Sequence, residues 1–224
     1  MDHEPGPGVC EEKSQRDRLI RLAATHPEWA LGFEDEVWWS RFEQPRMHAW
    51  TDTDRPLRLV EQPVAKEDED PKALACYGLL VQLRERAHGD VDQQMWLRFV
   101  TGRPVSDTTT QFLDWCCEKL EALGKRVLLM VWDNASWHKS KRVREWIGAH
   151  NRQAKDTGKG VRILPCFLPS KSPWLNPIEP KWLHGKRKVI EPDGALSAEQ
   201  LEGRVCTCFH CDQLDHLSIP ENVA

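Results

Sequence analysis

The 224-residue sequence predicts an α/β fold in which a β-meander and one helix precede alternating strands and helices. Two observations carry this prediction. The first part of the chain holds extended segments, whereas residues 106–123 place their apolar side chains at helical spacing and end at Gly124. Two nearly continuous apolar runs then flank a further helix, which is the pattern of a strand–helix–strand crossover between parallel strands.

The N-terminal half supplies a short helix and then the meander. Apolar residues at helical positions predict a helix over residues 12–24. The aromatic-rich residues 29–39 predict the first strand. Because side chains alternate along a strand, Asp35 points to one face while Glu34 and Glu36 point to the other. Three further extended segments complete the predicted meander: residues 57–62, 73–81 and 94–100.

A buried strand–helix–strand unit follows. The apolar run over residues 126–132 predicts a strand that is buried on both faces and ends at Asp133. Ser140 can cap the next helix. We expect a basic linker over residues 151–160 to lead to a second buried strand, residues 161–168.

Capping signals predict the last two helices. Asn176 is a good N-cap, with Pro177 at the first helical position and Glu179 at the third. Ser197 and Gln200 repeat this signature before a final helix.

Composition narrows the class of protein. An apolar fraction of 40% suits one well-buried core. No apolar run approaches the roughly 18 residues that span a bilayer, and the acidic N-terminus does not resemble a signal peptide, so we expect a cytoplasmic protein with no membrane partner. The eight cysteines lack the regular spacing of a secreted disulfide scaffold and are interpreted as reduced thiols.

The net charge of −4 conceals a strong segregation of charge. Residues 125–190 hold 15 Lys and Arg against 4 Asp and Glu, a net charge of +11, so the rest of the chain carries −15. A basic stretch can attract a polyanion locally, because exposed charges more than about 8 Å apart are largely screened at physiological salt. A solvated Lys and Arg surface explains the same pattern.

Three acidic residues stand where a metal site would need them. Cleavage and transfer of a phosphodiester by two Mg²⁺ or Mn²⁺ ions requires about three carboxylates from different elements. Asp35 lies on the first strand, Asp133 at the end of a buried strand and Glu179 at the start of a helix. Each also has a structural interpretation: an edge-strand charge, a turn residue and a capping residue, respectively.

Three blocks of sequence make the interpretation specific. They are GFEDE at residues 32–36, VWDNASWHKS at residues 131–140 and LPSKSPWLNPIE at residues 168–179. In order and spacing, these blocks resemble the three catalytic blocks of the mariner-like bacterial insertion-sequence transposases, which are DDE superfamily endonucleases. The resemblance extends from about residue 18 to residue 209.

The resemblance implies a ribonuclease H-like fold, with a mixed five-stranded sheet flanked by helices. The catalytic domain would comprise residues 29–190. An N-terminal arm with a short helix would precede it at residues 1–28, and a C-terminal helix and tail would follow at residues 191–224.

The resemblance also implies an activity and its cofactors. Asp35, Asp133 and Glu179 inherit the catalytic and metal-ligand roles, holding two Mg²⁺ or Mn²⁺ ions. The family nicks DNA at the ends of the element and transfers the freed 3′-hydroxyl to target DNA, typically at TA. The partners implied are therefore element-end and target DNA, in a bacterial cytoplasm and on the nucleoid when DNA is bound. A homodimer is a further expectation.

Two departures from the family pattern leave alternatives open. The 45 residues between Asp133 and Glu179 exceed the family's usual interval, and we assign the excess to the linker at residues 151–160, because surface loops tolerate insertions. Only about thirty residues precede Asp35, too few for the family's helix-turn-helix domains. The chain is then the second frame of a split element with an upstream helix-turn-helix partner, a truncated remnant, or a protein that relies on another partner.

Secondary candidates follow from the same blocks. Phosphate contacts from basic side chains would position DNA without reading its sequence, although a solvated helix face is the alternative. His138 could contact the scissile phosphate, but a structural role is the commoner one. A tail cluster could bind zinc, although its spacing is poor for four ligands. The proposed DNA contacts are Lys139, Lys141, Arg142, Lys171, Lys181, Lys186, Arg187 and Lys188, and the tail cluster is Cys206, Cys208, His210, Cys211 and His216.

Two other functions compete with an active transposase. A catalytically silent remnant would bind DNA or a partner without chemistry. An unrelated metal phosphohydrolase on the same fold would act on small phosphoesters.

Overall fold

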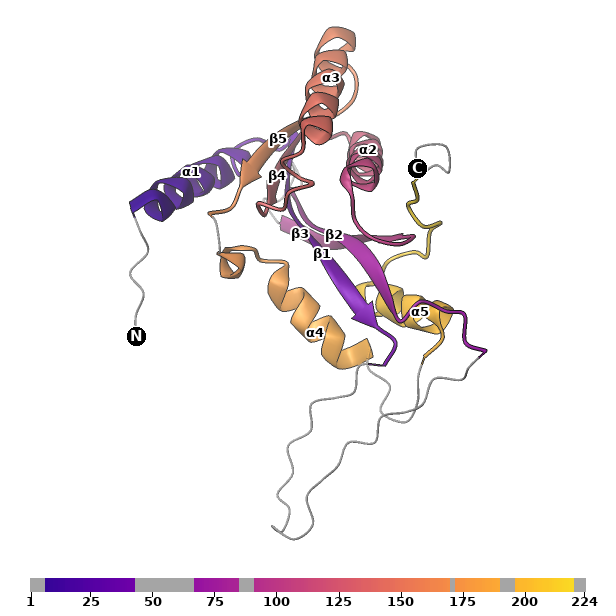
Figure 1. The fold of residues 1–224 in the computed structure, drawn as a ribbon. Helices are drawn as coiled ribbons and strands as arrows, with labels where there is room; N and C mark the ends of the chain where they lie inside the picture. The colour runs from indigo at the N-terminus through magenta and orange to yellow at the C-terminus, as the bar shows by residue number, and fades with distance from the viewer. Residues whose placement is uncertain (1–6, 43–66, 85–90, 170–171, 190–195, 220–224) are drawn as a thin grey trace, which may run out of the picture.

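A mixed five-stranded sheet forms the centre of the molecule (Figure 1). The computed structural model describes residues 7–42, 67–84, 91–169, 172–189 and 196–219. The strand order is β3-β2-β1-β4-β5; β3, β2 and β1 pair antiparallel, whereas β1, β4 and β5 run parallel. The strands are β1 (Trp29–Ser40), β2 (Ala73–Arg84), β3 (Val91–Val100), β4 (Val127–Trp132) and β5 (Arg162–Phe167).

Helices cover both faces of the sheet, giving three layers and two hydrophobic cores. One core packs α1, α4 and α5 against the sheet, and the other packs α2 and α3 against the opposite face. None of the described helices is both long and apolar enough to cross a bilayer. The helices are α1 (Pro7–Ala23), α2 (Ser106–Ala122), α3 (Lys141–Thr157), α4 (Glu179–Val189) and α5 (Ala198–Phe209), with a short 3₁₀ turn η1 (Pro173–Leu175).

This architecture confirms the predicted α/β fold with its mixed five-stranded sheet. The strand β4 is buried along its whole length, as the apolar run predicted. Ser197 and Gln200 form the predicted capping box: Ser197 Oγ accepts from the Gln200 N–H, and Gln200 Oε1 accepts from the Ser197 N–H. The predicted extended segment at residues 57–62 lies outside the described residues.

Two predictions about the crossover were wrong. The expected linker at residues 151–160 is mostly helix, because α3 continues to Thr157 and ends at Gly158 in the left-handed conformation. Asn151 fastens this added length to the sheet, since its amide exchanges two hydrogen bonds with the backbone of Ile163. The strand β5 is not buried on both faces, because it lies at the edge of the sheet, and residues such as Arg162 and Leu164 are exposed.

Candidate active site

The three predicted carboxylates line one cavity. Asp35, Asp133 and Glu179 stand around a hollow of about 390 Å³. They come from β1, from the residue after β4 and from the first residue of α4. We call this cavity the acidic pocket. Its other lining residues come from the loops that follow β4 and precede α4: Asn134, Ala135, Leu168, Pro169, Ser172 and Asn176.

The pairing of β1 with β4 brings the two aspartates together. In this parallel ladder Phe33 lies opposite Val131. Asp35 and Asp133 each follow two residues further along, and because side chains alternate, both point to the face that α4 covers. The carboxyl ends of parallel strands are where open α/β sheets gather ligands.

A glycine lets α4 approach the sheet closely enough to place Glu179. Gly78 on β2 lies opposite Asp35. A Cβ at this position would lie 2.2 Å from the Trp182 ring, so no larger residue fits without a shift. The Trp182 indole crosses this gap, and its Nε1–H donates to Asp35 Oδ2 at 2.9 Å. Trp182 therefore both packs α4 against the sheet and orients the carboxylate of Asp35.

Two asparagines fasten the loops of the acidic pocket. The Asn176 side-chain amide donates to the backbone carbonyl of Glu34 at 2.9 Å, and the Asn134 amide donates to the carbonyl of Leu168. The prediction that Asn176 caps a helix was wrong in detail, because its Oδ1, the atom that would cap, accepts no hydrogen bond among the described residues. The helix α4 begins only at Glu179, whose N–H donates to the backbone carbonyl of Asn176 in the preceding turn.

The three carboxylates differ in the direction in which their surroundings shift the pKa. Burial, and then the charge of Glu179, raise the pKa of Asp35 to about 7. Burial and the nearby Asp133 raise the pKa of Glu179. Burial also acts upward on Asp133, but hydrogen bonds from His138 and the Ala135 N–H outweigh it and hold the pKa of Asp133 below its usual range. Asp35 and Glu179 thus repel each other, and no neighbouring positive charge is strong enough to keep their pKa values at the ordinary level.

This donor set fits hard divalent cations. Carboxylate, amide and hydroxyl oxygens are the ligands that Mg²⁺ and Mn²⁺ prefer. Among the described residues, the one group of three whose ligand atoms all lie within 4.8 Å of one another is Glu34, Glu36 and His138, so the carboxylates of the acidic pocket are spaced more widely. Asp35, Asp133 and Glu179 are the residues that would hold such ions, which would supply the charge needed for phosphodiester cleavage.

Glu34, Glu36 and His138 form a second cluster behind the acidic pocket, which we call the buried cluster. The exposed fractions of these side chains are 1%, 8% and 0%. His138 Nε2 lies 3.0 Å from Glu36 Oε1 and 3.3 Å from Glu34 Oε2. Burial would lower the pKa of His138, but these carboxylates and Asp133 raise it to about 11. Burial and Glu36 raise the pKa of Glu34 well above its usual range.

The sequence interpretation missed most of this cluster. A structural role for His138 was correctly favoured, because a side chain with no exposed surface cannot contact a phosphate. Glu34 and Glu36 were placed on the right face of β1, but they were not assigned a partner. The available signal was that two acids on the inner face of a buried strand require a cation nearby.

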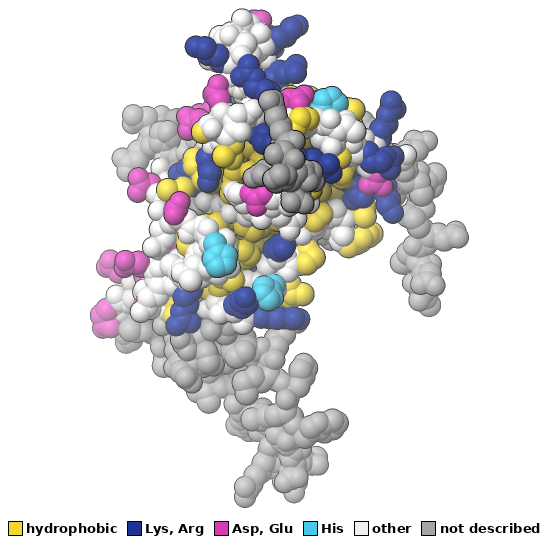
Figure 2. Space-filling model, turned by 180° about the vertical axis from the view of Figure 1, so that it is seen from behind, with side chains coloured by type: hydrophobic (Ala, Val, Ile, Leu, Met, Phe, Trp, Pro, Cys, Tyr) yellow, Lys and Arg dark blue, Asp and Glu magenta, His cyan; other side chains and the backbone are white. Residues whose placement is uncertain are grey.

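The basic side chains that were predicted to contact DNA spread over several surfaces. Lys186 lowers the pKa of Glu179, so it lies near the acidic pocket. Arg142 pairs with Asp107. Figure 2 shows Lys and Arg side chains standing out around α3 at the top of the molecule. Lys171 lies outside the described residues.

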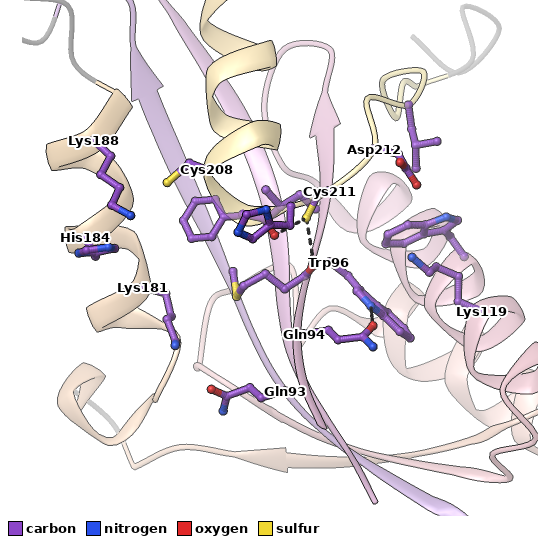
Figure 3. A pocket seen from close by; sticks show the side chains of 16 residues that line it. Gln93, Gln94, Trp96, Lys119, Lys181, His184, Lys188, Cys208, Cys211 and Asp212 are labelled. Atoms are coloured by element: carbon purple, nitrogen blue, oxygen red, sulfur yellow. Dashed lines mark hydrogen bonds between the residues drawn. The ribbon is translucent and has the colours of Figure 1, made fainter. Parts of the chain in front are cut away.

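Two of these lysines border a different cavity (Figure 3), of about 410 Å³. Lys181 and Lys188 reach it from α4, with Trp96 and Lys119 on the opposite side. The C-terminal cysteines and histidines, some of which line this cavity, have other partners: Cys211 Sγ donates to the Met95 carbonyl, and His216 pairs with Glu202. Within the described residues, they do not form a group that could hold a metal ion.

This chain is similar to one described family and, in its fold, to solved structures. Residues 87–202 match the family described as DDE superfamily endonuclease. The fold matches the Mos1 transposase paired-end complex with the left transposon end, with a TM-score of 0.57 at 15% identity over 95% of this chain and 58% of that chain. It also matches the Mos1 mariner paired-end complex with Mn, with a TM-score of 0.56 at 15% identity over 94% of this chain and 57% of that chain. For the Mos1 strand transfer complex the TM-score is 0.54 at 13% identity, over 95% of this chain and 56% of that chain.

The chain spans a little over half the length of these Mos1 chains. The likeness confirms the ribonuclease H-like fold. A search of curated proteins by sequence finds no match.

Proposed function

This chain belongs to the DDE superfamily endonucleases, and from that membership we propose that it is a transposase catalytic domain that cleaves DNA and transfers its strands. The observation that supports this proposal most strongly is the acidic pocket, where Asp35, Asp133 and Glu179 from three separate elements line one cavity. Structural interpretations explain each acid singly, but none of them explains why the three converge.

Within this proposal, the three carboxylates bind two Mg²⁺ or Mn²⁺ ions. When bound, such ions activate the attacking oxygen and stabilise the leaving one. Asp133 accepts hydrogen bonds from Ala135 and His138 at Oδ1, so Oδ2 is the oxygen that these partners leave for another ligand. Trp182 fixes Asp35 through Oδ2 in the same manner. The protein's contribution is to hold these oxygens in place before DNA arrives.

DNA is the proposed substrate and partner. The Mos1 structures are named as complexes with a transposon end or as a strand transfer complex, and we extend that substrate class to this chain. Lys186 acts on Glu179 and Lys139 acts on Asp133, so these two are the predicted phosphate contacts that the acidic pocket supports most directly. The other basic side chains, a TA target, a homodimer and a helix-turn-helix partner stay proposals of the same kind.

Metal-dependent nicking of plasmid DNA tests the proposed function. We expect the purified chain to convert supercoiled DNA to nicked circles with Mn²⁺ and not with EDTA. Asp133→Asn should lower the rate at least about 100-fold, because it weakens a metal ligand. Asp156→Asn makes the same change at an exposed position of α3 and should leave the rate unchanged within about twofold.

Two results would contradict the proposal. The first is nicking by Asp133→Asn at the wild-type rate. The second is a wild-type chain that binds DNA but does not nick it with either metal, which is the behaviour of a catalytically silent remnant.

A further inference from the structure

His138 connects the two clusters of acids. Its Nδ1 lies 2.9 Å from Asp133 Oδ1, and its Nε2 lies 3.0 Å from Glu36 Oε1. Because carboxylate oxygens only accept, each ring N–H donates to one acid. Asp133 directly follows β4 and Glu36 lies on β1, so the imidazole connects the two strands that position Asp35 and Asp133.

The imidazole has contacts at one ring face and at both ring nitrogens. Its ring stacks on Trp132 with 4.6 Å between ring centroids and 13° between ring planes. The Trp137 indole donates to Glu36 Oε1 at 2.6 Å, which fixes the acid that His138 also contacts. Glu34 Oε2 lies 3.3 Å from Nε2, yet neither of its oxygens has a hydrogen-bond partner among the described residues. Glu34 therefore acts on the ring as a nearby charge.

A ring fixed in this way restricts the rotation of the Asp133 carboxylate. The Asp133 side chain is 51% exposed, so its orientation depends on the two groups that donate to Oδ1, which are the His138 ring and the Ala135 N–H. The hydrogen bond from Nδ1 occupies Oδ1 and leaves Oδ2 for a cation. Groups that hold a metal ligand from behind typically alter metal affinity by roughly 10–100-fold when they are changed.

We propose that His138 is a positioning residue, which holds Asp133 in the orientation that binds a divalent cation and is itself anchored by the buried carboxylates Glu36 and Glu34. This inference rests on the proposed function, because it assigns a role to a residue that acts through a proposed metal ligand. It also implies that Glu34 and Glu36 bind His138 rather than a metal ion.

Two substitutions at His138 separate its two hydrogen bonds. Asn places an N–H near the position of Nδ1, and Gln places one near the position of Nε2. Both remove the ring that stacks on Trp132, so each serves as the folding control for the other. Isothermal titration with Mn²⁺ gives the affinity of each purified variant, and urea denaturation gives its stability.

We expect His138→Gln to weaken Mn²⁺ binding by roughly 10–100-fold and His138→Asn to weaken it by less than about threefold. Equal affinities of the two variants at similar stability would overturn the inference. A Mn²⁺ ion that is lost in Glu34→Gln while binding at Asp133 persists would also overturn it, because the buried cluster would then be a metal site. Failure of wild-type protein to bind Mn²⁺ instead contradicts the proposed function itself.

A measurement on wild-type protein covers the case in which the variants do not fold. In ¹⁵N NMR, the Nδ1 resonance of His138 should shift when Mg²⁺ is added, because its partner Asp133 gains a ligand, and the Nε2 resonance should shift less. A Nδ1 resonance that does not respond to saturating Mg²⁺ would contradict the positioning role.

Discussion

The acidic pocket and the buried cluster lie on opposite faces of β1 and differ in how their charges are compensated. Three consecutive residues supply both: Asp35 faces the pocket, whereas Glu34 and Glu36 face the other way. In the buried cluster a histidine stands between the acids at 3.0–3.3 Å. In the acidic pocket, repulsion from Glu179 helps to raise the pKa of Asp35 to about 7.

This difference teaches where an external cation should bind. A buried carboxylate must be neutralised, either by a proton, by a partner from the protein or by a bound ion. On one face of β1, His138 compensates the charges of Glu34 and Glu36, so no external cation is needed there. On the other face the repulsion between Asp35 and Glu179 persists when both are ionised, and either a proton or a bound cation can remove it. Four substitution and pH experiments sharpen this comparison.

The largest expected effect comes from removing the histidine of the buried cluster. His138→Ala leaves Glu34 and Glu36 without their cation in a buried site. Breaking a buried ion pair in this way typically costs about 3–5 kcal/mol of folding free energy. Urea denaturation measures the loss. A cost below about 1 kcal/mol would mean that the buried acids are not compensated by His138.

A steric substitution tests how α4 is seated over the acidic pocket. Gly78→Ala places a Cβ 2.2 Å from the Trp182 ring, and overpacking of this kind typically costs about 1–3 kcal/mol. DNA nicking should fall as well, because α4 carries Glu179. The matched control is Gly148→Ala on α3, where the nearest atom is the flexible end of Arg152 at 3.6 Å.

That control should be neutral or stabilising by about 0.5–1 kcal/mol, because alanine favours a helix more than glycine does. Equal stabilities of the two glycine variants would show that Trp182 does not pack against Gly78 as described.

Neutralising an acid of the acidic pocket should stabilise the metal-free protein. The folded pKa of Asp35, about 7, lies above its ordinary value of 3.8, so this group favours the folded state less as pH rises from about 4 to 7. Asp35→Asn removes that dependence. Its gain should be absent below pH 4 and reach about 1–2 kcal/mol above pH 7, since part of the three-unit difference is relieved by solvent.

Thermal unfolding in EDTA at pH 4 and pH 8 measures this gain. Asp35→Asn should also abolish nicking, so stability and activity move in opposite directions. A variant that is less stable than wild type at pH 8 would contradict the repulsion inferred for the acidic pocket.

The smallest expected effect is on metal affinity as a function of pH. Below about pH 7 the carboxyl group of Asp35 holds a proton that a metal ion must displace. The affinity for Mn²⁺ should therefore fall as pH is lowered from 8 to 6, by up to about tenfold per pH unit below 7. An affinity that does not change over this range would show that Asp35 does not take part in binding.

Sequence patterns predicted the local parts of this molecule well and its long-range contacts poorly. The first strand was assigned as residues 29–39 and spans Trp29–Ser40, because alternation and aromatic content are local properties. Burial of β5 was overestimated, since its place at the sheet edge depends on the order of the strands rather than on its own residues. The length of α3 was missed because polar residues 151–157 lacked an apolar face to reveal it.

In the candidate site, too, local motifs were readable from the sequence, whereas long-range contacts were not. The block motifs predicted that Asp35, Asp133 and Glu179 act together, and the three line one cavity, while their role as metal ligands stays a proposal. The contact of His138 with Glu36 joins residues 102 positions apart and leaves no local pattern. Likewise, nothing in the local sequence around Gly78 indicates that the Trp182 ring packs over it.

Crystals of the protein soaked in Mn²⁺, examined by anomalous diffraction, test the central claim most directly. We predict anomalous peaks in the acidic pocket, with oxygens of Asp35, Asp133 and Glu179 as ligands, and no peak between Glu34, Glu36 and His138. A peak in the buried cluster, or an acidic pocket without a peak at saturating Mn²⁺, would contradict the distinction between the two faces of β1.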